Sequence, residues 1–185
     1  MFPLVAKLLL NQQIKMSEGK LELLGVRTCF TPTETYVQIQ RSLEETGSQY
    51  LIYQSAKKAG YDWFKVMSEA YPGMKQSEAL KWGIDIVSLA GWGITELSKV
   101  DPEQKKATFT IRNSSIAKIY GKSESSVDHL FRGLVAGGVS FILKSELDCV
   151  ESKCVAKGDT LCQFIVGKLD ELNVPPLLLH THFGL

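Results

Sequence analysis

Apolar residues recur every three or four positions in several stretches of the chain, and this spacing predicts amphipathic helices. The first stretch holds Phe2, Val5, Leu8 and Leu9 and predicts a helix that ends by residues 17–19. The same spacing predicts helices over residues 48–67, 77–88 and 126–143. The middle two follow each other directly, so we expect them to pack against one another in sequence.

One further helix is predicted from its start signal. Thr31 can cap a helix whose first position is Pro32, and Glu34 can complete a capping box with Thr31. Proline fits the first helical position because that residue needs no backbone N–H donor. This helix is expected to cover residues 31–45.

Apolar and polar residues alternate in the other ordered stretches, which is typical of half-buried strands. In one of them Ala107, Phe109 and Ile111 would face a core, while the residues between them would face water. The strand candidates are residues 21–30, bent at Gly25, and residues 91–97, 107–112, 145–150 and 161–167. The order of the elements predicts an α+β fold in which helices pack on a small antiparallel sheet.

The length of 185 residues favours one domain with one substantial core. We divide the chain into an N-terminal amphipathic helix at 1–19, which offers a dimer contact, a domain at 20–168 and an apolar tail at 169–185. The tail is interrupted by Pro175-Pro176, so we expect an ordered arm or a contact with a neighbouring molecule. Its two histidines, His180 and His182, are more typical of a mobile terminus than of a metal site.

The charge pattern narrows the classes of partner. The chain has 21 Lys and Arg against 20 Asp and Glu, spread without a basic block, which argues against a nucleic-acid partner. The short apolar run at the N-terminus cannot span a bilayer and lacks the features of a signal peptide. We therefore expect a cytoplasmic protein, in which clustered cysteines indicate a metal rather than disulfides.

The candidate chemistry lies in Leu147 to Lys168, where Glu151, Cys154 and Cys162 flank a Lys-Gly-Asp turn. Thiolates and carboxylates are zinc ligands, and one wide turn can bring the three side chains together. The structural alternative is a core residue at Cys162, a buried thiol at Cys154 and a solvated charge at Glu151. The spacing differs from the usual pair of cysteines separated by two residues, so both interpretations stay open.

Small residues form a ridge on the predicted helix 126–143. Gly133, Ala136, Gly137 and Ser140 recur at one helical face, and each glycine costs roughly 1 kcal/mol of helix stability relative to alanine. Close packing of another element, or a ligand, must compensate for that cost. Motifs for a nucleophile, a zinc protease or a nucleotide cofactor are absent, so we do not expect an enzyme.

Residues 127–168 resemble the 4-vinyl reductase domain family, also called hydrocarbon-binding domains. The most specific part is ESKCVAKGDTLCQF, and the preceding GLVAGGVS also matches. The resemblance extends more loosely over 20–168. It implies a fold shared with the small subunits of the TRAPP tethering complex and with haem nitric-oxide-binding sensor domains, commonly as a homodimer, and a stand-alone archaeal protein.

The resemblance also implies a structural zinc. In the phenol-sensing members, a glutamate and two cysteines at the positions of Glu151, Cys154 and Cys162 hold the ion with a cysteine from the preceding helix. Here that helix position is occupied by Asp128, and His129 and Cys149 are alternative fourth ligands. Asp128 has a plain structural interpretation, because it can complete a capping box with Ser125 and pair with Arg132.

The family further implies a hydrophobic ligand between the helices and the sheet, and we place it near Trp92, Phe109 and Phe131, with Gly133 and Gly137 on the small ridge. The first hypothesis is therefore a sensor domain for a hydrophobic or aromatic molecule, acting through dimerisation or a partner protein. The second is a structural assembly module like the tethering-complex subunits, which predicts a filled core. The third is an enzyme or accessory protein in tetrapyrrole vinyl reduction, which would need a redox cofactor site.

Overall fold

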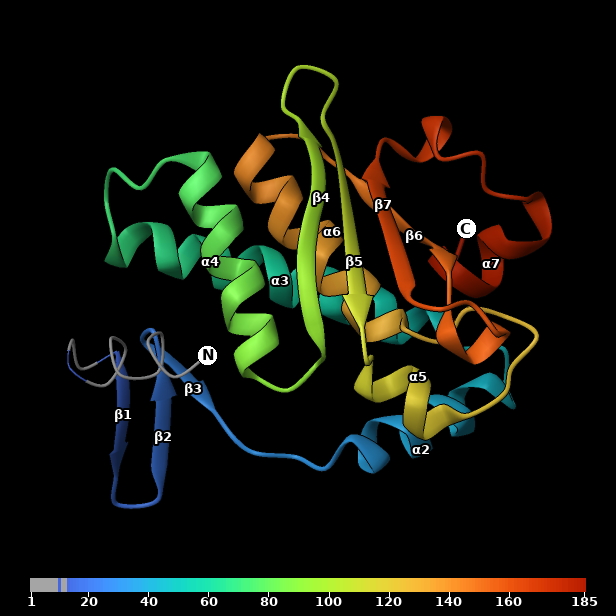
Figure 1. Cartoon of the computed structure of the whole chain (residues 1–185), viewed down its shortest axis with the longest axis horizontal. Coiled ribbons are helices and arrows are strands. Elements are labelled where there is room, and N and C mark those ends of the chain that lie inside the picture. Colours follow the sequence, from blue (N-terminus) through green and yellow to red (C-terminus); the bar gives the residue numbers. More distant parts are fainter. Residues whose placement is uncertain (1–9, 11–12) are drawn as a thin grey trace.

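The computed structural model describes residue 10 and residues 13–185, and it has the α+β architecture expected from the sequence (Figure 1). The α-helices are α2 (Thr33–Glu44), α3 (Tyr50–Ala70), α4 (Gln76–Leu89), α5 (Ser115–Tyr120), α6 (His129–Leu143) and α7 (Pro176–Phe183). The strands are β1 (Ile14–Ser17), β2 (Lys20–Leu23), β3 (Val26–Thr28), β4 (Ile94–Asp101), β5 (Lys106–Arg112), β6 (Asp148–Lys153) and β7 (Cys162–Gly167), with short 3-10 turns at Val155–Lys157 and Leu169–Glu171. No described helix is both long and apolar enough to cross a bilayer.

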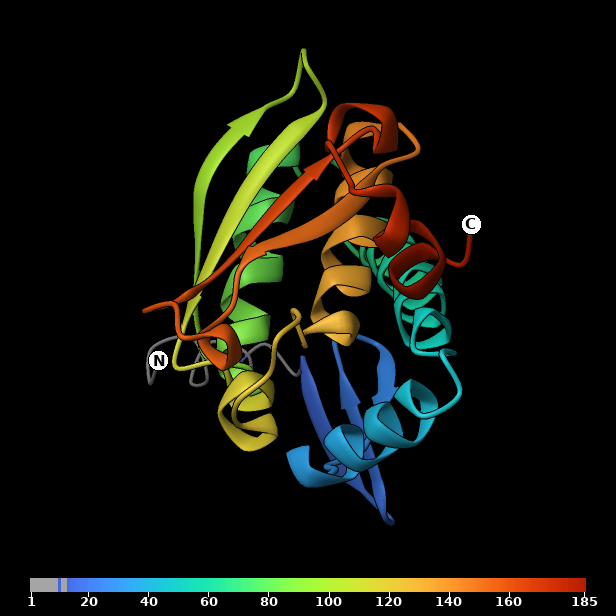
Figure 2. The same cartoon turned by 90° about the vertical axis from the view of Figure 1, so that its right-hand side faces the viewer.

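The main sheet is antiparallel and has the strand order β4-β5-β7-β6. Its inner face carries the alternating residues predicted for β5: Ala107, Phe109 and Ile111 are all buried. Phe109 is paired with Phe164 of β7, which is also buried, so the apolar set continues across the sheet. Figure 2 shows this sheet on one side, α4 and α6 behind it, and α3 beyond them. The core therefore lies between the sheet and the first helical layer.

The small-residue ridge of α6 is occupied by α3. A Cβ atom on Gly137 would lie 1.8 Å from the main-chain O of Lys57, and one on Gly133 would lie 2.4 Å from the main-chain O of Tyr53. Only glycine permits this approach of the two backbones. The expectation that Gly133 and Gly137 face a ligand is therefore wrong, because a helix fills the space above them.

The N-terminal part differs from the prediction. Strands β1, β2 and β3 form a separate antiparallel sheet, so the predicted helix cannot extend to residue 19, and residues 1–9, 11 and 12 lie outside the described part. The predicted bent strand over 21–30 is a hairpin instead, because Leu24 and Gly25 both have positive φ, at 54° and 81°. Leu24 is then buried against Met67 and Ile86, which anchors the small sheet to α3 and α4.

Two predicted helix starts are also corrected. Pro32 rather than Thr31 is the N-cap residue of α2, and no side-chain cap forms there. Helix α6 begins at His129 with Asp128 as its N-cap residue, three positions later than expected. Helix α5 was not predicted. It starts at Ser114, whose Oγ accepts a hydrogen bond from the N–H of Ala117.

The C-terminal stretch contains an ordered helix, α7, which begins at a proline pair and packs on α3. Phe183 is buried and meets Tyr53 edge-on at 5.0 Å between ring centroids. The main-chain O of Phe183 accepts a hydrogen bond from Nε2 of Gln54 at 2.9 Å. The interpretation of His180 and His182 as part of a mobile terminus is wrong, since His182 is buried.

Candidate functional site

Glu151, Cys154 and Cys162 meet at the end of the β6–β7 hairpin. Pairing between the strands shifts between Glu151 and Lys153, and the chain then makes a 3-10 turn and passes through Gly158 at a φ of 100°. Oδ2 of Asp159 accepts a hydrogen bond from the N–H of Cys154 at 2.8 Å and holds this turn closed. The hairpin therefore returns Cys162 to the side of Cys154.

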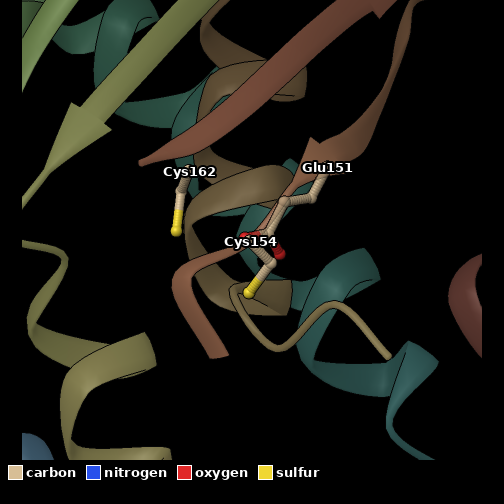
Figure 3. Close-up of side chains that lie close together, drawn as sticks. All are labelled: Glu151, Cys154 and Cys162. Carbon is tan, nitrogen blue, oxygen red and sulfur yellow. The ribbon is translucent and has the colours of Figure 1, made fainter. Parts of the chain in front are cut away.

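The three side chains form a compact donor set. One ligand atom from each residue lies within 4.8 Å of the others, and all three residues are buried (Figure 3). Oε2 of Glu151 accepts a hydrogen bond from the N–H of Asp128 at 3.0 Å, whereas Oε1 is buried without a partner. A buried carboxylate oxygen without a partner beside two thiols fits a missing cation, because such an oxygen is costly to leave unpaired.

The ionisation of the cluster has the same meaning. The hydrogen bond from the Cys162 thiol lowers the pKa of Cys154 to about 5, and this shared proton raises the pKa of Cys162. Burial and the nearby Asp128 carboxylate raise the pKa of Glu151 well above its ordinary value. Several acidic groups thus compete for few protons in a dry site, and a divalent cation would allow all of them to ionise.

Of the three alternatives for a fourth ligand, Asp128 lies nearest. Burial raises the pKa of Asp128 to about 7, and its carboxylate also interacts with the thiol of Cys162. It accepts hydrogen bonds from Oγ of Ser114 at 3.0 and 3.3 Å. The predicted pairing of Asp128 with Arg132 and its capping box are wrong, since Arg132 binds His182 and no side-chain cap forms.

The other two alternatives lie elsewhere. The His129 ring is 5.2 Å from the His182 ring, and its Nε2 lies 4.0 Å from Oε1 of Glu44. The Cys149 thiol is directed to the main-chain O of Val150 at 3.7 Å, and burial raises its pKa. Neither belongs to the described cluster of potential metal ligands. Glu151, Cys154, Cys162 and Asp128 are therefore the residues that could hold a zinc ion.

A separate cavity of about 310 Å³ lies between the sheet and the helices. Its wall includes Trp92, Phe109 and Phe131, the three aromatic residues predicted for a ligand site. Helices α3, α4 and α6 supply most of the remaining wall, and Thr28 of β3 and Thr95 of β4 complete it. Gly133 and Gly137 do not line it, because they face α3.

The cavity wall is almost entirely apolar. Among the described residues that line it, none carries a titratable side chain, and the polar ones are two threonines and two tryptophans. Phe64 from α3 enters between Gly83 of α4 and Gly138 of α6, where a Cβ atom would lie 2.7 and 2.4 Å from its ring. The sequence pattern could not identify Phe64 or Thr95 as lining residues, although Thr95 shares the inward face of the sheet with its paired residue Ile111.

The cavity and the cysteine cluster are connected through the first turn of α6. Phe131 lines the cavity, and Asp128, three residues earlier, lies at the cluster. Residues three apart lie on the same side of a helix. A movement of this turn would therefore be felt at both places.

Comparison with known proteins identifies this region. Residues 107–168 match the family model of the 4-vinyl reductase domain, and they run from β5 through α6 to the end of β7. The chain contains a 4-vinyl reductase domain. This confirms the resemblance predicted from the sequence. The matched region holds the whole cysteine cluster and one wall of the cavity, while α3, α4 and β4 supply the rest.

Similar proteins extend the comparison. An uncharacterized protein of Methanocaldococcus jannaschii is 30% identical over 88 residues, which are 48% of this chain, so the match spans about half (50%) of that relative. The phenol-responsive sensory domain of the transcription activator PoxR, crystallised with phenol, has a TM-score of 0.75 at 16% identity and covers 94% of this chain and 93% of its own. A vinyl-4-reductase family protein from M. jannaschii has a TM-score of 0.50 at 18% identity, covering 77% and 85%. The two structures show that the fold is shared.

Proposed function

We propose that this 4-vinyl reductase domain protein binds a small hydrophobic molecule in the cavity between α4, α6 and the main sheet, and that it acts as a sensor domain. The observation that carries the proposal is the cavity itself. Protein interiors are close-packed, and an apolar space of about 310 Å³ falls in the range of ligand pockets. The PoxR domain, which shares the fold, is phenol-responsive, which supports the same function here.

The size of the cavity separates the hypotheses. A water molecule occupies about 30 Å³ in the liquid, so the cavity has room for about ten groups of that size. The assembly-module hypothesis expects a filled core, and the cavity argues against it. A tetrapyrrole macrocycle exceeds this volume, so a compact ligand of one or two rings fits better.

We further propose that zinc, held by Glu151, Cys154, Cys162 and Asp128, fixes the hairpin against the start of α6. The ion would supply a structural cross-link and neutralise the clustered acidic groups. Ligand binding beside Phe131 would then order the first turn of α6 and change the surface around the hairpin, which a second copy of the chain or a partner protein would sense.

Chemical-shift mapping tests the binding proposal. A panel of neutral one- and two-ring compounds is titrated into the ¹⁵N-labelled full chain, and we expect shifts at the indole signals of Trp63 and Trp92 and at the amides of α4 and α6. Shifts confined to surface residues, or none at all across the panel, would contradict the proposal. Native mass spectrometry of the same sample reports bound zinc and the dimer.

A further inference from the structure

Thr95 places a hydroxyl group with unmet hydrogen-bonding capacity at the cavity wall. The residue is 6% exposed, and its Oγ1 is buried without a hydrogen-bond partner. Its backbone N–H already donates to Oγ of Ser88 at 3.1 Å. The second threonine of the wall differs, because Oγ1 of Thr28 donates to the main-chain O of Val26 at 3.2 Å.

An unpartnered buried hydroxyl is unfavourable, since it has lost water and gained nothing in return. Valine has the same branched shape and would fill the position without that cost. The arrangement is explained if a bound molecule supplies the missing partner.

We propose that Oγ1 of Thr95 is the hydrogen-bond anchor of the ligand, and that the ligand is an uncharged molecule of about two fused rings with one polar group. This inference rests on the proposed function of the cavity. The volume gives the size, as about ten water-sized groups fit. A hydroxyl both donates and accepts, so the polar group is an alcohol, a phenol or a carbonyl.

The absence of titratable side chains among the described lining residues excludes charged ligands. A carboxylate or an ammonium group entering this space would lose its hydration without gaining an ion pair, and one neutral hydroxyl cannot compensate for that loss. The site therefore selects against acids as strongly as it selects for apolar surface.

The test uses 2-naphthol, 2-methylnaphthalene and 2-naphthoate, which share the two fused rings and differ in the one substituent. Affinities of the full chain are measured at pH 7 by calorimetric titration with 2-naphthol and by competition with the other two. The variants are Thr95→Val, which keeps the shape, Thr95→Ser, which keeps the hydroxyl, and Thr28→Val, the same substitution at the partnered hydroxyl.

We expect Thr95→Val to bind 2-naphthol about 2- to 13-fold more weakly, the effect of one neutral hydrogen bond, and to bind 2-methylnaphthalene at least as well as the wild type. Thr95→Ser should retain the preference for 2-naphthol. Thr28→Val should change both affinities by the same factor. 2-Naphthoate should compete with none of them.

A structural readout accompanies the affinities. Because Thr95→Val removes an unpartnered polar atom, the ligand-free variant should melt at a temperature equal to or above that of the wild type. A lower melting temperature would show that the hydroxyl has a structural partner and would overturn the inference.

The two proposals fail in different ways. If the wild type binds 2-naphthol and 2-methylnaphthalene but Thr95→Val leaves their ratio unchanged, the cavity is a binding site and Thr95 is not its anchor. If the wild type binds neither compound, both proposals are overturned. Binding of 2-naphthoate as tightly as 2-naphthol would overturn the inference of an uncharged ligand.

Discussion

Nδ1 of His182 accepts a hydrogen bond from Nη1 of Arg132 at 2.9 Å, and the main-chain O of His182 accepts a second from Nη2, also at 2.9 Å. The guanidinium group is 1% exposed and lies over the rings of Tyr53 and Phe183, at 4.6 and 5.1 Å from their centroids. Because arginine is always a donor, the imidazole of His182 is neutral and protonated at Nε2. The last helix is thus fastened to the middle of α6 by one buried charge.

This contact predicts acid sensitivity. Burial and the charge of Arg132 lower the pKa of His182 to about 3. The unfolded chain takes up a proton at His182 near pH 6.5, whereas the folded chain does so only near pH 3, so the contribution to stability present above pH 6.5 declines as the pH falls through this window. His182→Gln has no titrating ring and should show a shallower decline in the free energy of unfolding between pH 7 and 4.5. Denaturant titrations at several pH values measure it, and identical slopes would refute the assignment.

Zinc binding should depend on the cluster and on no other cysteine. We expect about one zinc ion per wild-type chain by elemental analysis, and little in Cys154→Ser or Cys162→Ser, because thiolates are the strongest ligands present. Cys29→Ser is the matched control, as Cys29 is an exposed free thiol outside the cluster. Wild-type protein that stays zinc-free after incubation with excess zinc would contradict the assignment.

Asp128→Asn separates the fourth ligand from the other three. If Asp128 binds the ion, the variant should hold zinc more weakly by roughly 10- to 100-fold but not lose it, as is typical when one supporting group of a metal site is removed. A competition titration with a chromophoric chelator gives the affinity. Unchanged zinc affinity would restrict Asp128 to its hydrogen bonds with Ser114.

Neighbouring glycines of α6 should respond differently to alanine. Gly137→Ala sets a Cβ atom against the main-chain O of Lys57, which cannot move without displacing α3, so we expect a loss of about 1–3 kcal/mol or more. In Gly138→Ala the obstacle is the ring of Phe64, which lines the cavity and can turn into it. This variant should cost less stability but reduce ligand affinity. Thermal unfolding and ligand titration of both variants measure the contrast, and equal stability losses would contradict it.

The sequence predicted those features that depend on a local period. Alternation places Phe109 and Ile111 in the core, and the spacing of Glu151, Cys154 and Cys162 brings the three together in one hairpin. What lies outside a local pattern was not predictable. The ridge at Gly137 implies a close neighbour but does not say whether it is a helix or a ligand, and only the packing of α3 decides this.

Longer-range contacts were missed for the same reason. Nothing near His182 in the sequence indicates Arg132, fifty positions away, and the apolar residues of the tail fit several environments equally well. The choice of Asp128 over His129 depends on a helix rotation of one residue, which the start of α6 fixes three positions later than the serine pattern suggests.

Ligand binding by the cavity is tested most directly with a matched pair of variants. Val135→Phe places a ring in the cavity wall, whereas Val66→Phe makes the same change on the exposed side of α3, away from it. With 2-naphthol as the probe, calorimetric titration should show binding to the wild type and to Val66→Phe, and an affinity at least about tenfold lower for Val135→Phe, a difference of about 1.4 kcal/mol. Equal affinities for all three proteins, or no binding to any of them, would contradict a ligand site in this cavity.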